Sequence, residues 1–487
     1  MAVIQDHVAI SAVLQTASAP VTTYEQLFLA ADCADVPHDL RSIWTTKSSY
    51  TDDLTSSTNA YNFAAAFWAQ SRTATRLMVG FWAETDQENF VVFPGVETTI
   101  ATWVLKGATA YFKVAETGGA TVQEITVTGL DAVTTLAAVA ARITAGFVAT
   151  GGSDYESYTC TVDPTGRFII TSDDPGAANS YPIVITAGTT GTDISDLLVP
   201  ASAYQVAGLD AETPAAALAA ISAIDDDYYY ICYRGANGTG TSATSEQTAL
   251  STAVQSMDKL LVLHSSDVGC VSAVSTSDIA YVVDAAKDSR TAVIYSAHTA
   301  NFPDARVQGC VIPADEGTTS WAWQVLSGAN ESGLAGDGVT ALGLTTTQRT
   351  ALKNKNCNWI ESAGGSTYMY NGVTANGNEI RVMLGRDWFV NGITGEIFTD
   401  MLNSPLNAFD NSTLAKFEGI VRTWLDAALA RRIIIDTEDR PITIDFPDAD
   451  DFTTAQRASH TMTLSDVFVA YLNSAVNDVA ITGTFTI

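Results

Sequence analysis

Basic residues are scarce in this chain of 487 residues. It contains 24 lysines and arginines against 54 aspartates and glutamates, so its formal net charge is −30 at pH 7. A protein that binds nucleic acid or an anionic membrane surface needs clustered cations to meet the phosphate groups. The charge balance therefore argues against nucleic acid or a membrane surface as the main partner.

Long apolar runs are also missing. No uncharged apolar stretch reaches the length of about 18 residues that a membrane-spanning helix needs, so the sequence predicts no membrane insertion. The N-terminus shows no basic segment followed by an apolar one, and no secretory signal is expected.

Cysteines are few and widely spaced. None of the 6 cysteines forms a Cys-x-x-Cys pair, which argues against a metal site and against a disulfide framework. We expect free, buried thiols and synthesis in a reducing cytoplasm.

Recognisable catalytic patterns are absent as well. The sequence has no phosphate-binding loop, no His-Glu-x-x-His and no Gly-x-Ser-x-Gly. His264, Ser265 and Asp267 have the residue types of a hydrolytic triad, but neighbours at a strand end cannot all point at one another. The sequence therefore predicts no catalytic, cofactor-binding or metal-binding residue.

Three other features of the sequence have a structural interpretation that does not involve a ligand. We expect Asp225–Asp227 to be a solvated loop and not a cation site. Arg290 is expected to form an ion pair at the start of a strand and not to bind a substrate. The aromatic residues Tyr228–Tyr230, Trp321 and Trp323 are expected to pack a core and not to form a sugar-stacking platform.

What the chain does contain is an alternation of apolar strands and capped helices. Strands are expected at 24–30, 76–82, 227–234, 259–264 and 290–295, and helices at 59–70, 214–224, 244–257 and 275–286. The helix at 244 is expected to begin with a capping box of Thr244 and Gln247, and the one at 275 with Ser275 and Asp278. This pattern predicts an α/β fold with a mixed, largely parallel sheet flanked by helices.

The segment 96–206 has a different texture. Alternating runs such as 121–128 and 167–171 are separated by Gly and Asp-Pro turns, with one helix near 134–147. We expect a β-rich domain inserted into the α/β unit. It should face outward and be replaceable by a short linker without unfolding the rest.

Beyond residue 340, the sequence predicts a helix at 346–354, a hairpin of 366–370 and 379–384, helices at 388–402 and 414–431, and strands at 432–436 and 442–446. Around the helix 414–431, four cations outnumber Glu418 and Asp426, which gives a local charge of 4 − 2 = +2. These cations are Lys416, Arg422, Arg431 and Arg432. A helix C-terminus also favours cations, which is the alternative explanation.

Both ends of the chain alternate with the period of a β-strand. The apolar positions are Val8, Ile10 and Leu14 at one end and Val479, Ile481, Phe485 and Ile487 at the other. Each end could pair within its own domain or with a neighbouring molecule.

The order of these elements resembles that of the contractile tail sheath proteins of bacteriophages, in the subgroup with a β-rich insertion. The stretches that carry the resemblance are Tyr50–Leu54, Ala60–Gln70, Arg76–Gly80, Glu212–Pro214, Tyr228–Tyr233, Thr276–Ala280, Arg290–Tyr295 and Gly385–Trp388. Before the final strand, sheaths often carry a Gly-Ala-Ile-His-like stretch where this chain has Ser474–Asn477.

The resemblance implies a domain organisation. It consists of an N-terminal arm (1–16), a sheath core (17–95 and 207–404), the inserted domain (96–206), a C-terminal sheath domain (405–471) and a C-terminal arm strand (472–487). The terminal strands would be exchanged between subunits, and the four cations around 414–432 would face an inner tube.

The resemblance also implies a function. The chain would be a cofactor-free structural subunit, not an enzyme, whose hexameric rings stack helically around a tail tube protein. Baseplate and tail terminator proteins would be further partners. The sheath would assemble in the host cytoplasm, reside in the virion tail and contract to drive the tube through the host envelope. The alternatives are a β-rich surface or adhesive protein that binds glycans, an enzyme with an α/β core, and the sheath of a non-viral contractile injection particle.

Overall fold

The structure is a computed structural model. In it the chain forms two compact units. The second unit consists of Val36–Ser42 and Phe81–Ala217, and the first of the rest. The structure describes all residues except 1–23, 34–35, 37–39, 57, 73, 117–121, 152–153, 164–165, 178–181, 236–237, 298, 300–301, 327–343, 364–365, 405, 407, 459–461, 463, 465–466 and 474–487.

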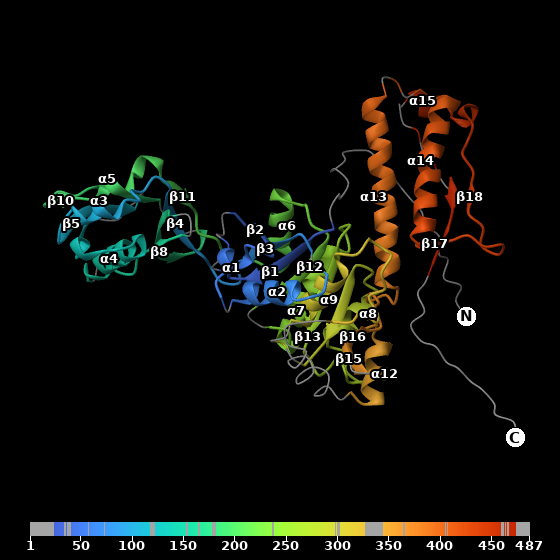
Figure 1. Ribbon diagram of the computed structural model, residues 1–487, viewed down its shortest axis with the longest axis horizontal. Helices are drawn as coiled ribbons and strands as arrows, with labels where there is room; N and C mark the ends of the chain where they lie inside the picture. Colours follow the sequence, from blue (N-terminus) through green and yellow to red (C-terminus); the bar gives the residue numbers. More distant parts are fainter. Residues whose placement is uncertain are drawn as a thin grey trace. The chain divides into compact units, whose positions relative to one another are not determined.

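The first unit is built on a mixed sheet of 8 strands in the order β16-β15-β14-β13-β12-β1-β3-β2 (Figure 1). Neighbouring strands from β1 through β12, β13 and β14 to β15 run parallel, and β16 is antiparallel to β15. The strands are β1 (Gln26–Ala31), β2 (Ser42–Thr46), β3 (Arg76–Trp82), β12 (Tyr230–Arg234), β13 (Leu260–Ser265), β14 (Thr291–Tyr295), β15 (Asn358–Ala363) and β16 (Ser366–Tyr370). The predicted α/β class with a mixed, largely parallel sheet is confirmed.

Helices accompany this sheet, as the alternating pattern predicted. They are α1 (Tyr50–Asp53), α2 (Asn59–Trp68), α6 (Pro214–Ile224), α7 (Thr244–Val254), α8 (Ile279–Ala286), α9 (Pro303–Val311) and α12 (Thr346–Asn354). The central strands are buried along their whole length, since every residue of β12, β13 and β14 is buried. Strands buried on both faces explain the continuous apolar runs in the sequence.

Side-chain caps decide where several of these helices begin. The Thr58 hydroxyl accepts from the Tyr61 amide at the start of α2, and Thr345 forms a capping box with Gln348 at the start of α12. The two predicted caps in the middle of the chain are wrong. Helix α8 is capped by Asp278 and not by Ser275, and Ala243, which ends a short 3-10 turn, stands at the N-cap of α7.

The second unit contains two four-stranded sheets, and residues of both sheets contribute to one hydrophobic core. In one sheet β5 (Thr109–Glu116) pairs with β6 (Gln123–Thr128), β9 (Ile183–Ala187) and β10 (Thr192–Asp193); the other has the order β11-β4-β8-β7. The remaining elements are β4 (Glu88–Phe93), β7 (Thr159–Val162), β8 (Phe168–Pro175), β11 (Tyr204–Val206), α3 (Ile100–Val104), α4 (Leu136–Val148) and α5 (Ser195–Leu198). The core includes Phe112, Phe147 and Phe168, all fully buried.

This unit is larger than the insertion 96–206 predicted from the sequence. Strand β4 begins at Glu88, and it pairs with both β8 and β11. The predicted boundary at residue 96 lies inside the unit, because β4 and β8 cannot be separated without breaking a sheet.

The C-terminal part of the first unit is a pair of long helices with very short strands. Helices α13 (Ile380–Asn403) and α14 (Asn411–Ala430) pack against each other through a cluster that contains Phe389, Val421 and Leu425 (Figure 1). They are followed by β17 (Ile434–Ile435), β18 (Thr443–Ile444), α15 (Thr454–Ala458), β19 (Phe468–Val469) and β20 (Tyr471–Leu472).

The predicted hairpin of 366–370 and 379–384 is wrong. Strand β16 pairs with β15 instead, and residues from Ile380 onward form the first turns of α13. The run Ile380-Arg-Val-Met-Leu384 alternates like a strand, but packing overrides this local pattern, since Ile380 and Leu384 are buried four residues apart on one helix face.

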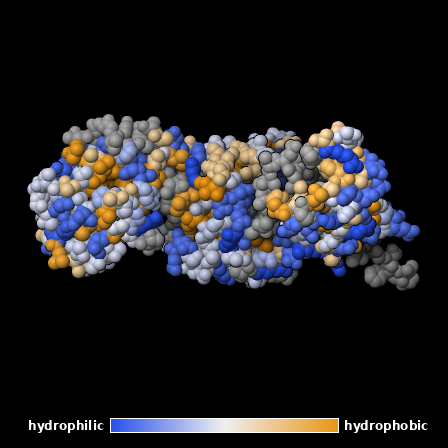
Figure 2. Space-filling view, turned by 90° about the horizontal axis from the view of Figure 1, so that it is seen from above, coloured by the Kyte–Doolittle hydropathy of each residue, from blue (hydrophilic) through white to orange (hydrophobic). Residues whose placement is uncertain are grey.

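The described surface carries no large uniform patch on the face drawn in Figure 2, where hydrophobic and hydrophilic residues are interspersed. Among the described residues, no helix combines the length and the apolar composition that crossing a bilayer requires.

Candidate functional site

The carboxyl ends of the parallel strands are the first place to look for chemistry. The strand order reverses between β1 and β12, because β3 lies on one side of β1 and β12–β15 follow on the other. In open α/β sheets, ligands bind outside the carboxyl ends of the strands at such a reversal. Arg234, the last residue of β12, stands at this position.

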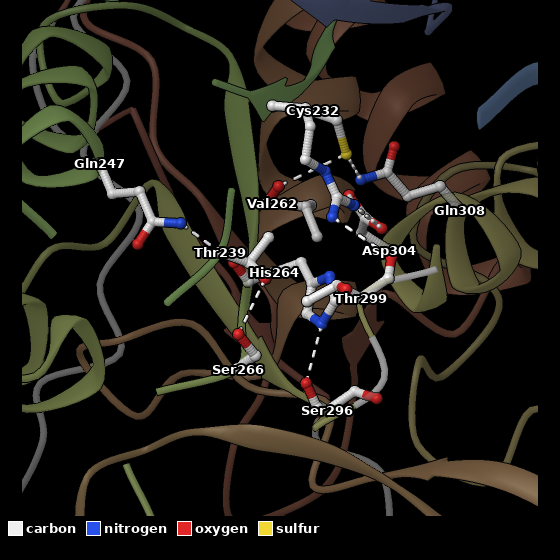
Figure 3. Close-up of polar contacts among 11 residues, drawn as sticks. Cys232, Thr239, Gln247, Val262, His264, Ser266, Ser296, Thr299, Asp304 and Gln308 are labelled. Carbon is white, nitrogen blue, oxygen red and sulfur yellow. Dashed lines mark hydrogen bonds and ion pairs between the residues drawn. The ribbon is translucent and has the colours of Figure 1, made fainter. Parts of the chain in front are cut away.

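The position at Arg234 is occupied by Asp304 of the same chain, which Figure 3 labels. Nη2 of Arg234 donates to Oδ1 of Asp304 at 3.2 Å, and the two side chains are 5% and 0% exposed. Asp304 lies in the first turn of α9, and the ring of Phe302, just before that helix, lies 4.6 Å from the guanidinium carbon. The N-terminus of α9 therefore occupies the place where many α/β enzymes hold a ligand.

His264 lies beside this ion pair and is equally buried. Its Nε2 donates to the carbonyl of Ser296 at 3.0 Å, while its own carbonyl accepts from Nε2 of Gln247 at 3.0 Å (Figure 3). Burial, helped by the nearby charge of Arg234, lowers the pKa of His264 to about 4. The imidazole is therefore neutral at pH 7 and is held by one main-chain carbonyl.

The structure does not bring the four residues of the sequence His264-Ser-Ser-Asp267 together. The hydroxyl of Ser265 contacts the thiol of Cys270 at 3.5 Å, and the hydroxyl of Ser266 accepts from Thr239 at 3.0 Å. The carboxylate of Asp267 accepts from the amide of Gly269 at 2.8 Å. Each of the four side chains has a different neighbour, as expected of a turn. His264, Ser265 and Asp267 therefore do not form a nucleophile–base arrangement.

The acidic run Asp225–Asp227 is not a cation site either. Asp225 accepts from the indole of Trp44 at 2.8 Å, Asp226 pairs with Lys259 at 3.0 Å, and Asp227 pairs with Arg76. The three residues lie in the loop between α6 and β12, as expected, and the side chains of Asp226 and Asp227 are 52% and 41% exposed, although each carboxylate also has a partner. Across the described residues, no three His, Cys, Asp or Glu side chains come together as metal ligands would.

The other sequence predictions can be placed as well. All 6 cysteines are free and buried, and burial raises the pKa of Cys270 to about 12, so this thiol stays protonated. Arg290 pairs with Asp387 and, at 3.1 Å, with Asp258, as predicted. Tyr228, Tyr229, Tyr230 and Trp321 are buried, whereas Trp323 is 45% exposed and stacks on Tyr368.

The four cations around α14 have different surroundings. Arg431 pairs with Glu316 at 3.3 Å and lies over the ring of Trp388, and Arg422 pairs with Glu418 one turn earlier. Lys416 is exposed, with its Nζ 3.5 Å from the hydroxyl of Ser404. Arg432 is exposed too and takes the left-handed conformation, φ 59°, directly after the C-cap of α14.

The end of the described chain forms two very small sheets. Ile434 and Ile435 of β17 pair with Leu472 and Tyr471, and Thr443 and Ile444 of β18 pair with Val469 and Phe468. In the described part of the chain, each of these sheets has two strands. The predicted terminal strand residues Val8, Ile10, Leu14, Val479, Ile481, Phe485 and Ile487 lie outside the described residues.

Three buried residues with structural importance escaped the sequence analysis: Arg234, Asp304 and Arg381. A charged residue that ends an apolar strand, as in Tyr230–Arg234, is a usable signal for a buried ion pair. Its partner could not be predicted, because Asp304 lies 70 residues away.

Comparison with known proteins gives a consistent but distant result. No family model matches the chain, and no curated protein matches it. Among solved structures, the chain is similar to the helical sheath of the anti-feeding prophage in its contracted state, with 12% identity, 97% of each chain covered and a TM-score of 0.48.

Two bacterial structures show a similar degree of likeness. For the sheath tail protein from Desulfitobacterium hafniense, the identity is 9%, with 94% of this chain and 98% of that one covered and a TM-score of 0.44. For the sheath tail protein from Listeria innocua, the identity is 9%, with 88% and 89% covered and a TM-score of 0.43. The three solved structures named here are described as a contractile helical sheath and two sheath tail proteins.

Proposed function

We propose that this protein is the structural subunit of a contractile sheath. Copies of the chain would form rings of six that stack helically around an inner tube protein, bounded by baseplate and terminator proteins. The sheath would reside in the tail of the particle. The proposal covers both a phage tail sheath and the sheath of a non-viral injection particle.

The observation that carries this proposal is the pair of very short sheets that residues 468–472 form. Residues 468–472 form two strands of two residues each, and each pairs with one equally short strand. Isolated two-stranded sheets are marginally stable, and an unpaired strand edge offers main-chain donors and acceptors to another chain. The alternating run Asp478–Ile487 begins after five intervening residues. Strands at the end of a chain and short sheets near them are the parts that strand exchange requires.

The exchanged strand has enough apolar surface to hold two subunits together. Its apolar positions Val479, Ile481, Phe485 and Ile487 share one face. Each could contribute about 1.5–3 kcal/mol if fully buried, before the cost of ordering the segment is subtracted. In a polymer this contact repeats with every subunit. The exchanged strands could therefore keep neighbouring subunits connected while the subunits move.

The core also favours a structural role over catalysis. The reversal point of the sheet is occupied by the Arg234–Asp304 pair and by the start of α9. Buried ion pairs of this kind would suit a subunit that transmits force, because they keep the subunit rigid while its contacts with other subunits change. Contraction would then be a rotation and shift of near-rigid subunits between two packings, with a modest free-energy difference per subunit summed over many subunits.

Removal of residues 478–487 tests this proposal. The full chain should form tubes or rings in negative-stain electron microscopy, and the truncated chain should be a soluble monomer that unfolds cooperatively. A peptide of residues 478–487 should compete with assembly of the full chain. Normal polymers from the truncated chain would contradict strand exchange, and outright unfolding would mean that the segment belongs to its own subunit's core.

The opposite faces of the same strand provide a matched control. Changing Val479, Ile481, Phe485 and Ile487 to Thr should abolish polymers. Changing Thr482, Thr484 and Thr486 to Ser should leave them intact, because these positions lie on the other face.

A further inference from the structure

Arg381 is a buried cation that contacts three separate segments of the main chain. It lies in the first turn of α13 and is 6% exposed. Its Nη1 donates to the carbonyls of Gly317 at 3.1 Å and Arg432 at 3.2 Å, and its Nη2 donates to the carbonyl of Asn473. A guanidinium is suited to this task, because it presents five donors in a fixed plane.

Two of these carbonyls belong to the end of a helix and to the end of the described chain. Arg432 follows the C-cap of α14, where the amide of Ile433 donates back to the carbonyl of Ala428 at 2.9 Å. Asn473 is the residue from which the C-terminal segment continues. Its amide donates to the carbonyl of Ile433 at 2.8 Å, and its Nδ2 donates to the carbonyl of Arg432 at 3.1 Å.

The third carbonyl lies at a close crossing of two backbones. Gly317 has φ 70°, and a Cβ at this position would lie 2.6 Å from the Cα of Gly385 in α13. At Gly385 itself, a Cβ would lie 2.7 Å from the side chain of Ile433. Gly317 and α13 are therefore packed backbone against backbone next to Arg381, and the side chain of Ile433, just after α14, packs against Gly385.

The foot of α13 is also tied to the sheet, six residues further along. Asp387 accepts from the hydroxyl of Tyr229 at 2.5 Å and from Nη2 of Arg290 at 3.2 Å. Six residues correspond to about 9 Å along a helix. One stretch of α13 thus holds the central sheet through Asp387 and holds Asn473 through Arg381.

We infer that Arg381 is the positioning residue for the start of the C-terminal segment: it fixes the position and direction of the backbone at Asn473 and couples this residue mechanically to α13. The inference rests on the proposed strand exchange. A segment that adds to a neighbour's sheet must arrive in register, and a fixed starting point lowers the ordering cost of binding. Movement of α13 with the sheet would then carry the start of the exchanged strand with it.

The test compares Arg381→Gln with Arg349→Gln. Arg349 is the matched control, because it is a half-exposed arginine in a salt bridge with Glu361 at 2.6 Å. In the non-assembled protein, hydrogen exchange at the amides of residues 471–473 should become about tenfold faster in Arg381→Gln, as expected for the loss of a charge-assisted hydrogen bond. It should not change in Arg349→Gln, and exchange in β13 should be the same in both variants.

Electron microscopy of the same proteins gives the second readout. Arg381→Gln should raise the protein concentration needed for polymers and make them irregular, while Arg349→Gln should assemble like the parent chain. Unchanged exchange at residues 471–473, or unchanged polymers despite faster exchange, would overturn the positioning role. If the parent chain forms no polymers, the sheath proposal fails, and the exchange result still decides whether Arg381 anchors Asn473.

A conservative variant covers the possibility that Arg381→Gln does not fold. Arg381→Lys keeps the charge but concentrates the donors on one nitrogen, so it cannot span three carbonyls in the same way. We expect its exchange rate and its polymers to lie between those of the parent chain and those of Arg381→Gln. Parent-like behaviour of Arg381→Lys in both assays would show that charge alone suffices, and would overturn the claim.

Discussion

Two buried arginines in the first unit show two different ways of using the same side chain. Arg234 at the carboxyl edge of the sheet is neutralised by the carboxylate of Asp304, which is 0% exposed. Arg381 at the foot of α13 is bound mainly by main-chain carbonyls at the ends of other segments, with Glu379 at 3.8 Å. The first arrangement closes the chain on itself. The second joins α13 to the backbone at Gly317, Arg432 and Asn473.

The difference separates a part of the subunit that should stay rigid from a part that should connect to other molecules. A buried ion pair is costly to break, because removal of one partner leaves the other charged and unsolvated. Main-chain carbonyls at a helix end can be satisfied by water if the arginine is lost. We therefore expect changes at the carboxyl edge to affect folding and changes near Arg381 to affect assembly.

The largest effect is expected from Asp304→Ala. This change leaves the cation of Arg234 buried without its partner and should lower the free energy of unfolding by about 3–5 kcal/mol. Urea unfolding followed by circular dichroism measures the change. The control is Asp196→Ala, which removes an exposed pair with Lys106 and should cost about 0–1 kcal/mol. An equal decrease in the free energy of unfolding in the two variants would contradict the distinction between buried and exposed ion pairs.

The second effect is a pH dependence from His264. Its pKa is about 4 in the folded protein, against about 6.5 in an unfolded chain. The folded state therefore favours the neutral ring, and its contribution is complete above pH 6.5. It is lost as the pH falls toward 4, at a total cost of about 3 kcal/mol.

The measurement is the free energy of unfolding as a function of pH for the parent chain and for His264→Gln, in which the amide nitrogen can still donate to the carbonyl of Ser296. The difference between the two proteins should shrink or reverse between pH 6.5 and 4. Parallel pH curves would show that His264 does not titrate in this range.

A pair of glycines extends the comparison to backbone packing. Gly309 in α9 lies so close to α2 that a Cβ would come within 2.0 Å of the carbonyl of Phe67, whereas a Cβ at Gly419 in α14 would meet nothing within 4 Å. Gly309→Ala should therefore destabilise the protein by about 1–3 kcal/mol. Gly419→Ala should stabilise it by about 0.5–1 kcal/mol through helix propensity. A destabilising Gly419→Ala would mean that this face of α14 is packed in solution.

The sequence analysis was most successful where local patterns and packing agree. Apolar runs such as Leu260–Ser265 predicted the central strands, and the helix expected at 346–354 is α12 (Thr346–Asn354). It failed where they disagree, as at Ile380–Leu384, where an alternating run became the first turns of a helix. Boundaries set by long-range pairing, such as that of β4 with β8, have no local signature at all.

The candidate site was harder to predict for the same reason. Residue types excluded common catalytic motifs, and the turn at His264–Asp267 followed from its position at a strand end. The ion pair of Arg234 and Asp304 depends on a contact across 70 residues of sequence. Arg381 binds carbonyl oxygens, which every residue carries, so nothing in the sequence identifies its partners.

The central claim is that copies of this chain assemble through their C-terminal strands. A reconstruction of polymers of the purified full-length protein, by electron microscopy at a resolution that traces the backbone, tests it most directly. The account predicts a helical stack of rings in which Val479–Ile487 lies as a strand in the sheet of a neighbouring copy and leaves its own subunit at Asn473. A strand that pairs within its own subunit, or a protein that remains monomeric at high concentration, would contradict it.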